Sequence, residues 1–326
     1  MRDLKNIPFS WLAVLLSALV VLLIGVNLSV GYVSLSFNDF VTSTENNLIS
    51  SMRINRVWVM ILAGLSIPTS GFLLQEYFQN PLAGPSVLGI SSVASLSVAL
   101  YLFLSYDFKV PVLLQDGLVS IFAVLGSFVL MLLLLVFAKK FTDSSFLIIF
   151  GFLISALAGA VVSVLQLYAD NQSLKNYVLW SFGANSQVTR SQVKLLTLLV
   201  ILGLLLSSKA IKPLIPGSLG KEYSKSLGVN LEQLKYIIIL SSSLLSASVT
   251  AFLGPILFIG IVVPHFSRLL YNPSRLWHQW LLNLLIGMIV MLGFSILSEL
   301  TLFPINVITS LFGIPVILLM LLKSRT

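Results

Sequence analysis

Long apolar segments separated by short polar stretches follow one another along the whole chain of 326 residues. About 20 apolar residues cross a bilayer as a helix, and ten segments reach or approach that length. They are residues 9–33, 57–76, 88–105, 117–138, 146–168, 191–207, 236–253, 256–270, 278–298 and 306–322. Runs such as Leu195–Leu206 lack the alternation that a membrane β-barrel requires. The pattern predicts an all-α, polytopic membrane protein with about ten transmembrane helices.

Composition supports this class. Hydrophobic residues make up 57% of the chain and charged residues 9%, against about 45–50% and about 25% in soluble domains. The first apolar run is longer than a signal-peptide core, so we interpret it as a retained membrane helix. Without cysteines, the chain can form neither disulfides nor thiolate metal sites. Because neither a soluble domain nor a repeat is visible, we expect one transmembrane domain over residues 1–326.

Basic residues are unevenly distributed between the two sides of the predicted helices. Placing both termini in the cytoplasm puts 13 of the 19 lysines and arginines on the cytoplasmic side and six outside. Cytoplasmic loops carry such an excess. The outer six are Arg53, Arg56, Lys109, Lys175, Arg190 and Lys194. The net charge of +8 could suggest nucleic acid, but membrane orientation explains it better, so no nucleic-acid partner is expected.

Chemistry that would drive transport or catalysis is not visible in the chain. The nearest match to a nucleotide-binding P-loop, Gly220-Lys221, has Ile215 and Glu222 where glycine and a hydroxyl belong. His265 and His278 lack acidic residues at ligand spacing, so we expect no metal or catalytic site. Ion-coupled carriers usually bury ionisable groups, and only Glu76 and Glu299 come near such a position. Energy should therefore come from another polypeptide, with an ion-coupled secondary transporter as the alternative.

One segment must interrupt a membrane helix. Prolines 81 and 85 in Asn80-Pro81-Leu82-Ala83-Gly84-Pro85 each remove a backbone donor and clash with the preceding turn. At membrane depth such a break is tolerated only where protein or a water-filled cavity supplies hydrogen-bond partners. We therefore expect a broken helix between the second and third crossings.

Two polar stretches are predicted to fold into short helices. On the cytoplasmic side, the loop of residues 208–235 contains a turn signal at Pro216-Gly217. A short helix from Glu222 to Leu227 should end at Gly228, with Asn230 capping a second short helix, which together form a compact knob. On the outer side, residues 170–187 and about 34–56 could hold surface helices.

Several motifs occur in a fixed order and together are specific. They are Arg53-x-x-Arg56, Gly71-x-x-x-Gln75, Asn80-Pro-Leu-Ala-x-Pro-x-x-Leu-Gly-Ile-Ser91, Trp180-Ser-Phe-Gly183, Glu222 six residues before Gly228, Gly254-Pro-Ile through Pro264-His265-x-x-Arg268, and Gly313-x-Pro315. In this combination the chain resembles the FecCD-type permeases, the membrane subunits of ABC importers for iron–siderophore, haem and cobalamin complexes. The resemblance runs from about residue 50 to the C-terminus and implies ten membrane helices and the type II importer permease fold.

The resemblance also implies roles for particular residues, each beside a simpler interpretation. Arg53 and Arg56 would dock an extracytoplasmic binding protein, or act only as interfacial anchors. Asn55 stands where the family has proline. Gln75, Asn80, Pro81 and Leu82 would shape the translocation path, or only break the helix. Ser144 and Ser145 match the cytoplasmic gate, or cap a helix. The ATPase-coupling residues would be Leu219, Glu222, Ser226, Leu227 and Gly228, unless the segment is a plain solvated loop.

The implied function is the permease subunit of an ABC importer for a ferric siderophore, in the bacterial inner membrane. Its expected partners are a second permease subunit, two ATPase subunits that bind ATP and Mg, a binding protein, the iron chelate and membrane lipid. No cofactor is expected in the chain itself. Haem or cobalamin uptake is the alternative within the class.

Overall fold

A computed structural model describes residues 8–31, 33, 47–104, 112–140, 144–183, 188–217, 221–271 and 275–323. All regular structure in these ranges is helical. The helices are α1 (Phe9–Ser29), α3 (Asn47–Phe78), α4 (Ile90–Leu104), α5 (Val112–Lys140), α6 (Ser144–Tyr168), α7 (Asn171–Phe182), α8 (Arg190–Gly217), α9 (Lys221–Ser226), α10 (Leu231–Leu253), α11 (Ile259–Leu270), α12 (Leu276–Thr301) and α13 (Ile305–Lys323).

Ten of these helices correspond to the ten predicted crossings. Within the described ranges, α1, α3, α5, α6, α8, α10 and α12 are long and apolar enough to span a bilayer, and α4, α11 and α13 are shorter apolar helices. The predicted polytopic all-α class is confirmed. Segments 88–105 and 256–270 correspond to α4 and α11, the two shortest of these ten helices, and each is preceded by an irregular stretch.

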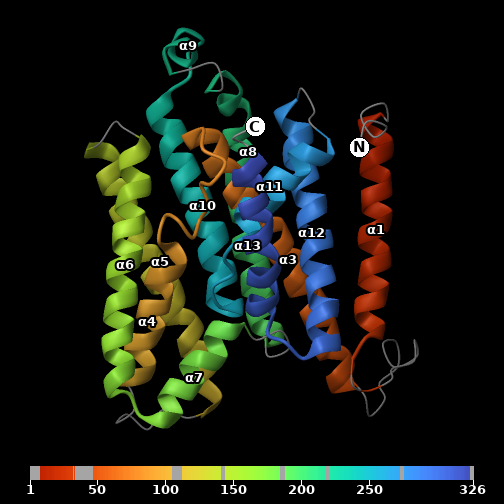
Figure 1. Ribbon diagram of the computed structural model, residues 1–326, viewed down its shortest axis with the longest axis vertical. Coiled ribbons are helices and arrows are strands. Elements are labelled where there is room, and N and C mark those ends of the chain that lie inside the picture. Colours follow the sequence, from red (N-terminus) through yellow and green to blue (C-terminus); the bar gives the residue numbers. More distant parts are fainter. Residues whose placement is uncertain are drawn as a thin grey trace.

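The crossings alternate in direction (Figure 1). The start of α1, the end of α13 and the six-residue helix α9 lie at one end of the bundle, and α7 lies at the other. We call the end with α9 the inner end and the end with α7 the outer end. The start of α1 and the end of α13 therefore lie at the same end of the bundle as α9, and the assignment of this end to the cytoplasm stays a prediction.

Helix α3 is the centre of the bundle and α1 is its most peripheral helix. Most of α3 is buried against α8, α10, α11 and α12, whereas only Leu12, Val20 and Asn27 of α1 are buried. Glycines allow the central helices to approach closely, as in many membrane proteins. A Cβ at Gly71 would lie 1.7 Å from the carbonyl oxygen of Gly260 in α11.

Two helix boundaries differ from the sequence prediction. Helix α3 begins at Asn47, ten residues before the predicted start, so Arg53 and Arg56 belong to the helix itself. Helix α8 continues through Pro213 to Gly217. The predicted loop of residues 208–235 is therefore shorter, since the extended end of α8 buries Ala210, Ile211 and Leu214.

Candidate functional site

At the outer end, two arginines of α3 hold the C-terminal end of α1. Arg53 and Arg56 are each only 5% exposed. Arg53 Nη1 donates to the carbonyl oxygens of Leu28 (3.0 Å) and Ser29 (3.3 Å), and Nη2 donates to that of Val33. The last carbonyls of a helix lack partners within the helix and carry its negative dipole end. Arg53 therefore caps α1.

Arg56 extends this contact to a third helix. Its Nη2 donates to the carbonyl oxygens of Asn27 (2.6 Å) and Val30 (3.0 Å), and its Nη1 forms an ion pair with Glu299 Oε1 of α12 at 2.6 Å. The buried Asn27 side chain in turn donates to the Leu292 carbonyl oxygen of α12. We call Asn27, Arg53, Arg56 and Glu299 the outer clamp. Since the arginine donors point into the subunit, the geometry supports anchoring, and docking by these residues stays a prediction.

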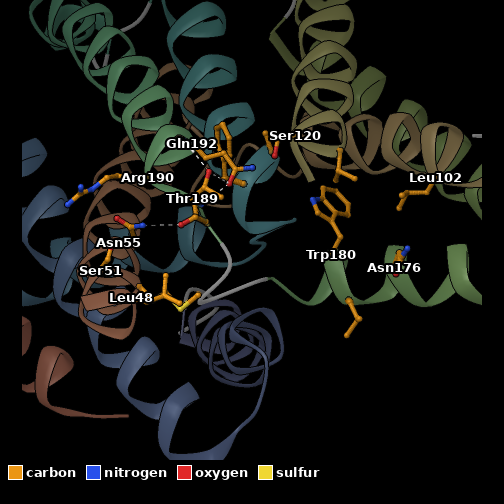
Figure 2. Close-up of a pocket in the computed structure, with 16 residues that line it drawn as sticks. Leu48, Ser51, Asn55, Leu102, Ser120, Asn176, Trp180, Thr189, Arg190 and Gln192 are labelled. Atoms are coloured by element: carbon orange, nitrogen blue, oxygen red, sulfur yellow. Dashed lines mark hydrogen bonds between the residues drawn. The ribbon is translucent and has the colours of Figure 1, made fainter. Parts of the chain in front are cut away.

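A large outer pocket lies between α3, α4, α5, α7, α8 and α10 (Figure 2). Its volume is about 820 Å³. The polar groups that line it are mainly neutral, and they include Ser51, Asn55, Ser120, Asn176, Trp180, Thr189 and Gln192. Figure 2 shows the Arg190 side chain extending away from the other lining residues. The pocket can therefore offer hydrogen bonds and apolar surface, and Arg190 is the cation among its described lining residues.

Local structure fixes the walls of the outer pocket. Thr189 caps α8: its backbone N–H donates to Gln192 Oε1 (2.8 Å), and Gln192 N donates back to the Thr189 hydroxyl (3.4 Å). Asn55 Nδ2 donates to the carbonyl oxygen of Val188 (3.3 Å) and ties α3 to this cap. The indole Nε1 of Trp180 is buried without a hydrogen-bond partner.

The predicted outer helix in residues 170–187 is α7, which forms another wall. The Asp170 side chain caps it by accepting from the backbone N–H groups of Gln172 (2.9 Å) and Ser173 (3.0 Å). Hydrogen bonds from Ser173, and then from Gln172, hold the pKa of Asp170 below its ordinary value. Gly183 ends the helix at φ +85°.

The broken segment follows α3 at the inner end, where the sequence placed it. The chain leaves the helix after Phe78 and re-enters one at Ile90. Asn80 Oδ1 accepts from Leu82 N (2.9 Å), and the Asn80 carbonyl oxygen accepts from Ala83 N (3.0 Å), so short turns satisfy the backbone. Half-exposed Asn80 and Leu82 flank Pro81, which is exposed.

Neighbouring helices enclose the rest of this segment. Pro85 packs against Gly260 of α11, and Leu88 lies so close to Gly151 of α6 that a Cβ there would be 2.6 Å from the Leu88 Cα. The predicted break is confirmed, and protein supplies its surroundings. A role of Asn80, Pro81 and Leu82 in the translocation path stays a prediction.

A polar cluster joins α3 to α11 immediately before the break. Gln75 is 3% exposed, and its Nε2 donates to the Ile261 carbonyl oxygen (3.2 Å). Arg268 of α11 donates from Nη1 to Gln75 Oε1 (3.0 Å) and forms an ion pair from Nη2 to Glu76 Oε1 (2.7 Å). We call Gln75, Glu76 and Arg268 the inner cluster. It makes Gln75 a link between helices, and its predicted role in the path stays untested.

The other inner-end predictions are placed only in part. Helix α6 begins at Ser144, so Ser144 and Ser145 lie in its first turn, while their side chains lie outside the described residues. The predicted short helix is α9, followed by the exposed Leu227 and by Gly228 at φ +79°. Leu219 and the side chain of Glu222 also lie outside the described residues.

One detail of the predicted knob is wrong. Asn230 caps a helix, with its Oδ1 accepting from Gln233 N (3.0 Å), but that helix is the 23-residue α10 rather than a second short one. Gly228 therefore joins α9 directly to a membrane-crossing helix. The Ser226 hydroxyl donates to the Tyr223 carbonyl oxygen within α9 and its turn.

Sequence reasoning missed the partners of the two carboxylates. Glu76 and Glu299 were singled out as the acidic residues nearest the membrane, but their pairing with Arg268 and Arg56 depends on contacts between residues 192 and 243 positions apart. The sequence offered one indication of these partners: a carboxylate at a helix end needs a cation nearby if it is buried.

This architecture, with alternating crossings and an irregular segment enclosed between α3 and α4, is that of a polytopic α-helical membrane protein. Comparison with known proteins gives its family. The model of the FecCD transport family matches residues 12–323, and the chain belongs to this family.

Curated relatives extend this match. The chain is 31% identical to the hemin transport system permease protein HmuU of Yersinia pestis, over 98% of this chain and 97% of that protein. It is also 31% identical to the vitamin B12 import system permease protein BtuC of Vibrio vulnificus, over 97% and 95%. The chain is thus an ABC importer permease of the FecCD family, a multi-pass protein of the bacterial inner membrane.

A solved structure agrees with the fold. An ABC transporter described as of the metal-chelate type, in an inward-facing conformation, superposes with a TM-score of 0.83 at 24% sequence identity. The match covers 97% of this chain and 100% of the other.

Proposed function

We propose that this permease passes a ferric siderophore across the inner membrane. It would work with a second permease subunit, two ATPase subunits that bind ATP and Mg, and an extracytoplasmic binding protein. The named cargoes of its relatives, haemin and vitamin B12, are bulky metal complexes. A chelate of similar bulk is the cargo class that these relatives support.

The outer pocket is the observation that carries the proposal for this chain. Its volume of about 820 Å³ lies within the range of about 300–1,000 Å³ of pockets that enclose compact organic ligands. Serine, asparagine, threonine, glutamine and indole groups match the many oxygen atoms of a siderophore, and Leu48, Met52 and Phe252 offer apolar contact. A ligand entering from outside would meet this pocket before the broken segment.

In the proposed cycle, the two ends of the bundle have different tasks. ATP binding and hydrolysis in the partner subunits would move α9, which Gly228 connects to α10. Helix α10 packs against α3 and α8, so a rigid displacement of α10 would reach the walls of the outer pocket. The inner cluster would then hold or release α11 beside the broken segment.

Haem or cobalamin is the second candidate cargo, and the names of the relatives favour it. Purifying the whole importer with its binding protein and identifying the bound chelate by mass spectrometry separates these cargoes. We expect a ferric siderophore. Recovery of haem or cobalamin would overturn the assignment of cargo while leaving the importer class intact.

Transport assays test the class itself. Right-side-out vesicles that contain the complete importer should take up the labelled ferric siderophore from binding protein added outside only when ATP and Mg are enclosed. A complex whose ATPase cannot hydrolyse ATP is the control. Uptake that needs no ATP and collapses with an ionophore would instead indicate a secondary transporter.

A further inference from the structure

One exposed face of α8 changes from leucine to lysine at the inner end. Leu195, Leu198, Leu202 and Leu205 are 45–58% exposed and follow the alternating spacing of three and four that marks one helix face. Lys209 and Lys212 continue the same spacing and are also exposed. The exposed face is therefore apolar along the membrane and positively charged at its inner end. A phospholipid is built in the same order, with acyl chains that end in a charged headgroup.

A second pocket opens at the charged end of this face. It has a volume of about 400 Å³ and lies between the last turns of α8 and the first turns of α10. Pro213, Val229 and Ile237 form apolar walls, while Lys212 and Gln233 supply side-chain N–H donors. Lys212 is the charged residue among the described lining residues, and Lys209 does not line the pocket. The two lysines therefore share a helix face but differ in their access to the pocket.

We propose that this pocket binds the anionic headgroup of a phospholipid. Its phosphate would lie between Lys212 and Gln233, and an acyl chain would follow Leu205 and Leu202 of α8. Anionic lipids concentrate in the cytoplasmic leaflet and attract basic residues beside membrane helices. Continuity between the pocket and the exposed leucine face favours a lipid over a side chain of the ATPase.

The position of the pocket connects lipid binding to coupling. Gly228, Val229 and Asn230 line it and also form the connection from α9 to α10. Among the described residues other than its two chain neighbours, no atom lies within 4 Å of the position where Gly228 would carry a Cβ, so the headgroup would fill space beside this connection. Bound lipid should therefore stiffen the joint through which α9 moves α10. This consequence, unlike the binding itself, rests on the proposed function.

Native mass spectrometry of the purified permease, titrated with phosphatidylglycerol, tests the binding. We expect Lys212→Gln to weaken the first lipid adduct about tenfold, which corresponds to about 1.4 kcal/mol. Lys209→Gln removes the same charge from the same face without changing the pocket, and it should weaken the adduct clearly less than Lys212→Gln does. Ile237→Trp, which keeps every charge but fills the pocket, should abolish the adduct. Thermal unfolding of each variant checks that it is folded.

Each other outcome would overturn the proposal. Equal losses from both lysine variants would mean diffuse surface attraction, and no loss from either would place the lipid elsewhere. Equally tight adducts with phosphatidylcholine would remove the anionic requirement, and displacement by inorganic phosphate at equal concentration would indicate a free-anion site. If Lys212→Gln weakens binding of the ATPase subunit but not of lipid, the pocket belongs to that protein. Because no ATP or chelate is present, failure here leaves the transport proposal untouched.

Discussion

The two ends of α3 carry similar ion pairs in different settings. At the outer end, Arg56 meets Glu299 with side chains 4% and 23% exposed, and further carbonyl groups of α1 surround Arg56. At the inner end, Arg268 meets Glu76 with side chains 26% and 19% exposed, and a glutamine completes the cluster. The outer arginine is thus far more deeply enclosed than the inner one.

This difference indicates different uses of the same chemistry. The outer clamp fastens a peripheral helix whose own apolar face is little buried, so its polar contacts replace missing packing. The inner cluster joins two well-packed helices next to a broken segment, where the α3–α11 contact is already secured by close glycine approach. A buried ion pair is costly to break, whereas the charged groups of a more solvent-exposed ion pair can replace each other with water. We therefore expect the outer end to be rigid and the inner end to be the one that rearranges.

Arg56→Met should have the largest effect on stability. It removes the guanidinium that contacts Glu299 Oε1 and the carbonyl groups of Asn27 and Val30, and removing one partner of a buried pair costs about 3–5 kcal/mol. Thermal unfolding in lipid nanodiscs measures the loss. Restored stability in the double variant Arg56→Met, Glu299→Met, which removes both charges, would support the pairing argument. A melting temperature equal to that of the unmodified protein would contradict it.

Arg268→Met should cost less. Its charged hydrogen bonds to Gln75 and Glu76 are partly exposed. We therefore expect the free energy of unfolding to fall by no more than about 3 kcal/mol. The same unfolding measurement compares it directly with Arg56→Met. Arg268→Met should also reduce transport more than its small loss of stability accounts for, because the inner cluster adjoins the broken segment. For Arg56→Met we expect no such additional loss of transport. If Arg268→Met destabilises the protein more than Arg56→Met does, the inner end would be the more firmly held one, contrary to our expectation.

Arg53→Lys separates anchoring from docking with a smaller change. Lysine keeps the positive charge but loses the planar fork that reaches the carbonyl groups of Leu28, Ser29 and Val33. We expect a destabilisation of about 1 kcal/mol, with capture of the binding protein nearly unchanged. Binding is measured by surface plasmon resonance with the immobilised permease. Weakened capture at full stability would instead assign Arg53 to docking.

Gly228→Pro should have the smallest effect on stability and a large effect on coupling. Proline requires a φ near −65°, whereas Gly228 has φ +79°. The substitution should therefore remodel the joint between α9 and α10 while the membrane helices stay folded. Uptake and stimulated ATP hydrolysis in vesicles should be lost, with a melting temperature close to that of the unmodified protein. Gly228→Asn is the control, because asparagine tolerates positive φ, and normal uptake in the proline variant would place the coupling contact elsewhere.

The local features of the candidate site were largely predictable. The break after α3, the helix that becomes α7, the short helix ahead of Gly228 and the Asn230 cap depend on neighbouring residues, through proline geometry and side-chain caps. The interpretation of Arg53 and Arg56 as flanking residues was not sufficient, because α3 begins earlier and α1 returns to cover them. Nothing near these arginines in sequence marks the carbonyl groups or the carboxylate that they contact.

Sequence alone determined the membrane class, the ten crossings and the place of the broken helix, because hydrophobic length and proline chemistry act within one segment. The tertiary structure decided which charges are buried and with which partners. It also decided that α1 is held by its C-terminal carbonyl groups and that two pockets open at opposite ends of the bundle. These features depend on helices far apart in the chain, such as α1, α3 and α12 at the outer clamp. Their register is set by side-chain packing between helices, and no local pattern encodes it.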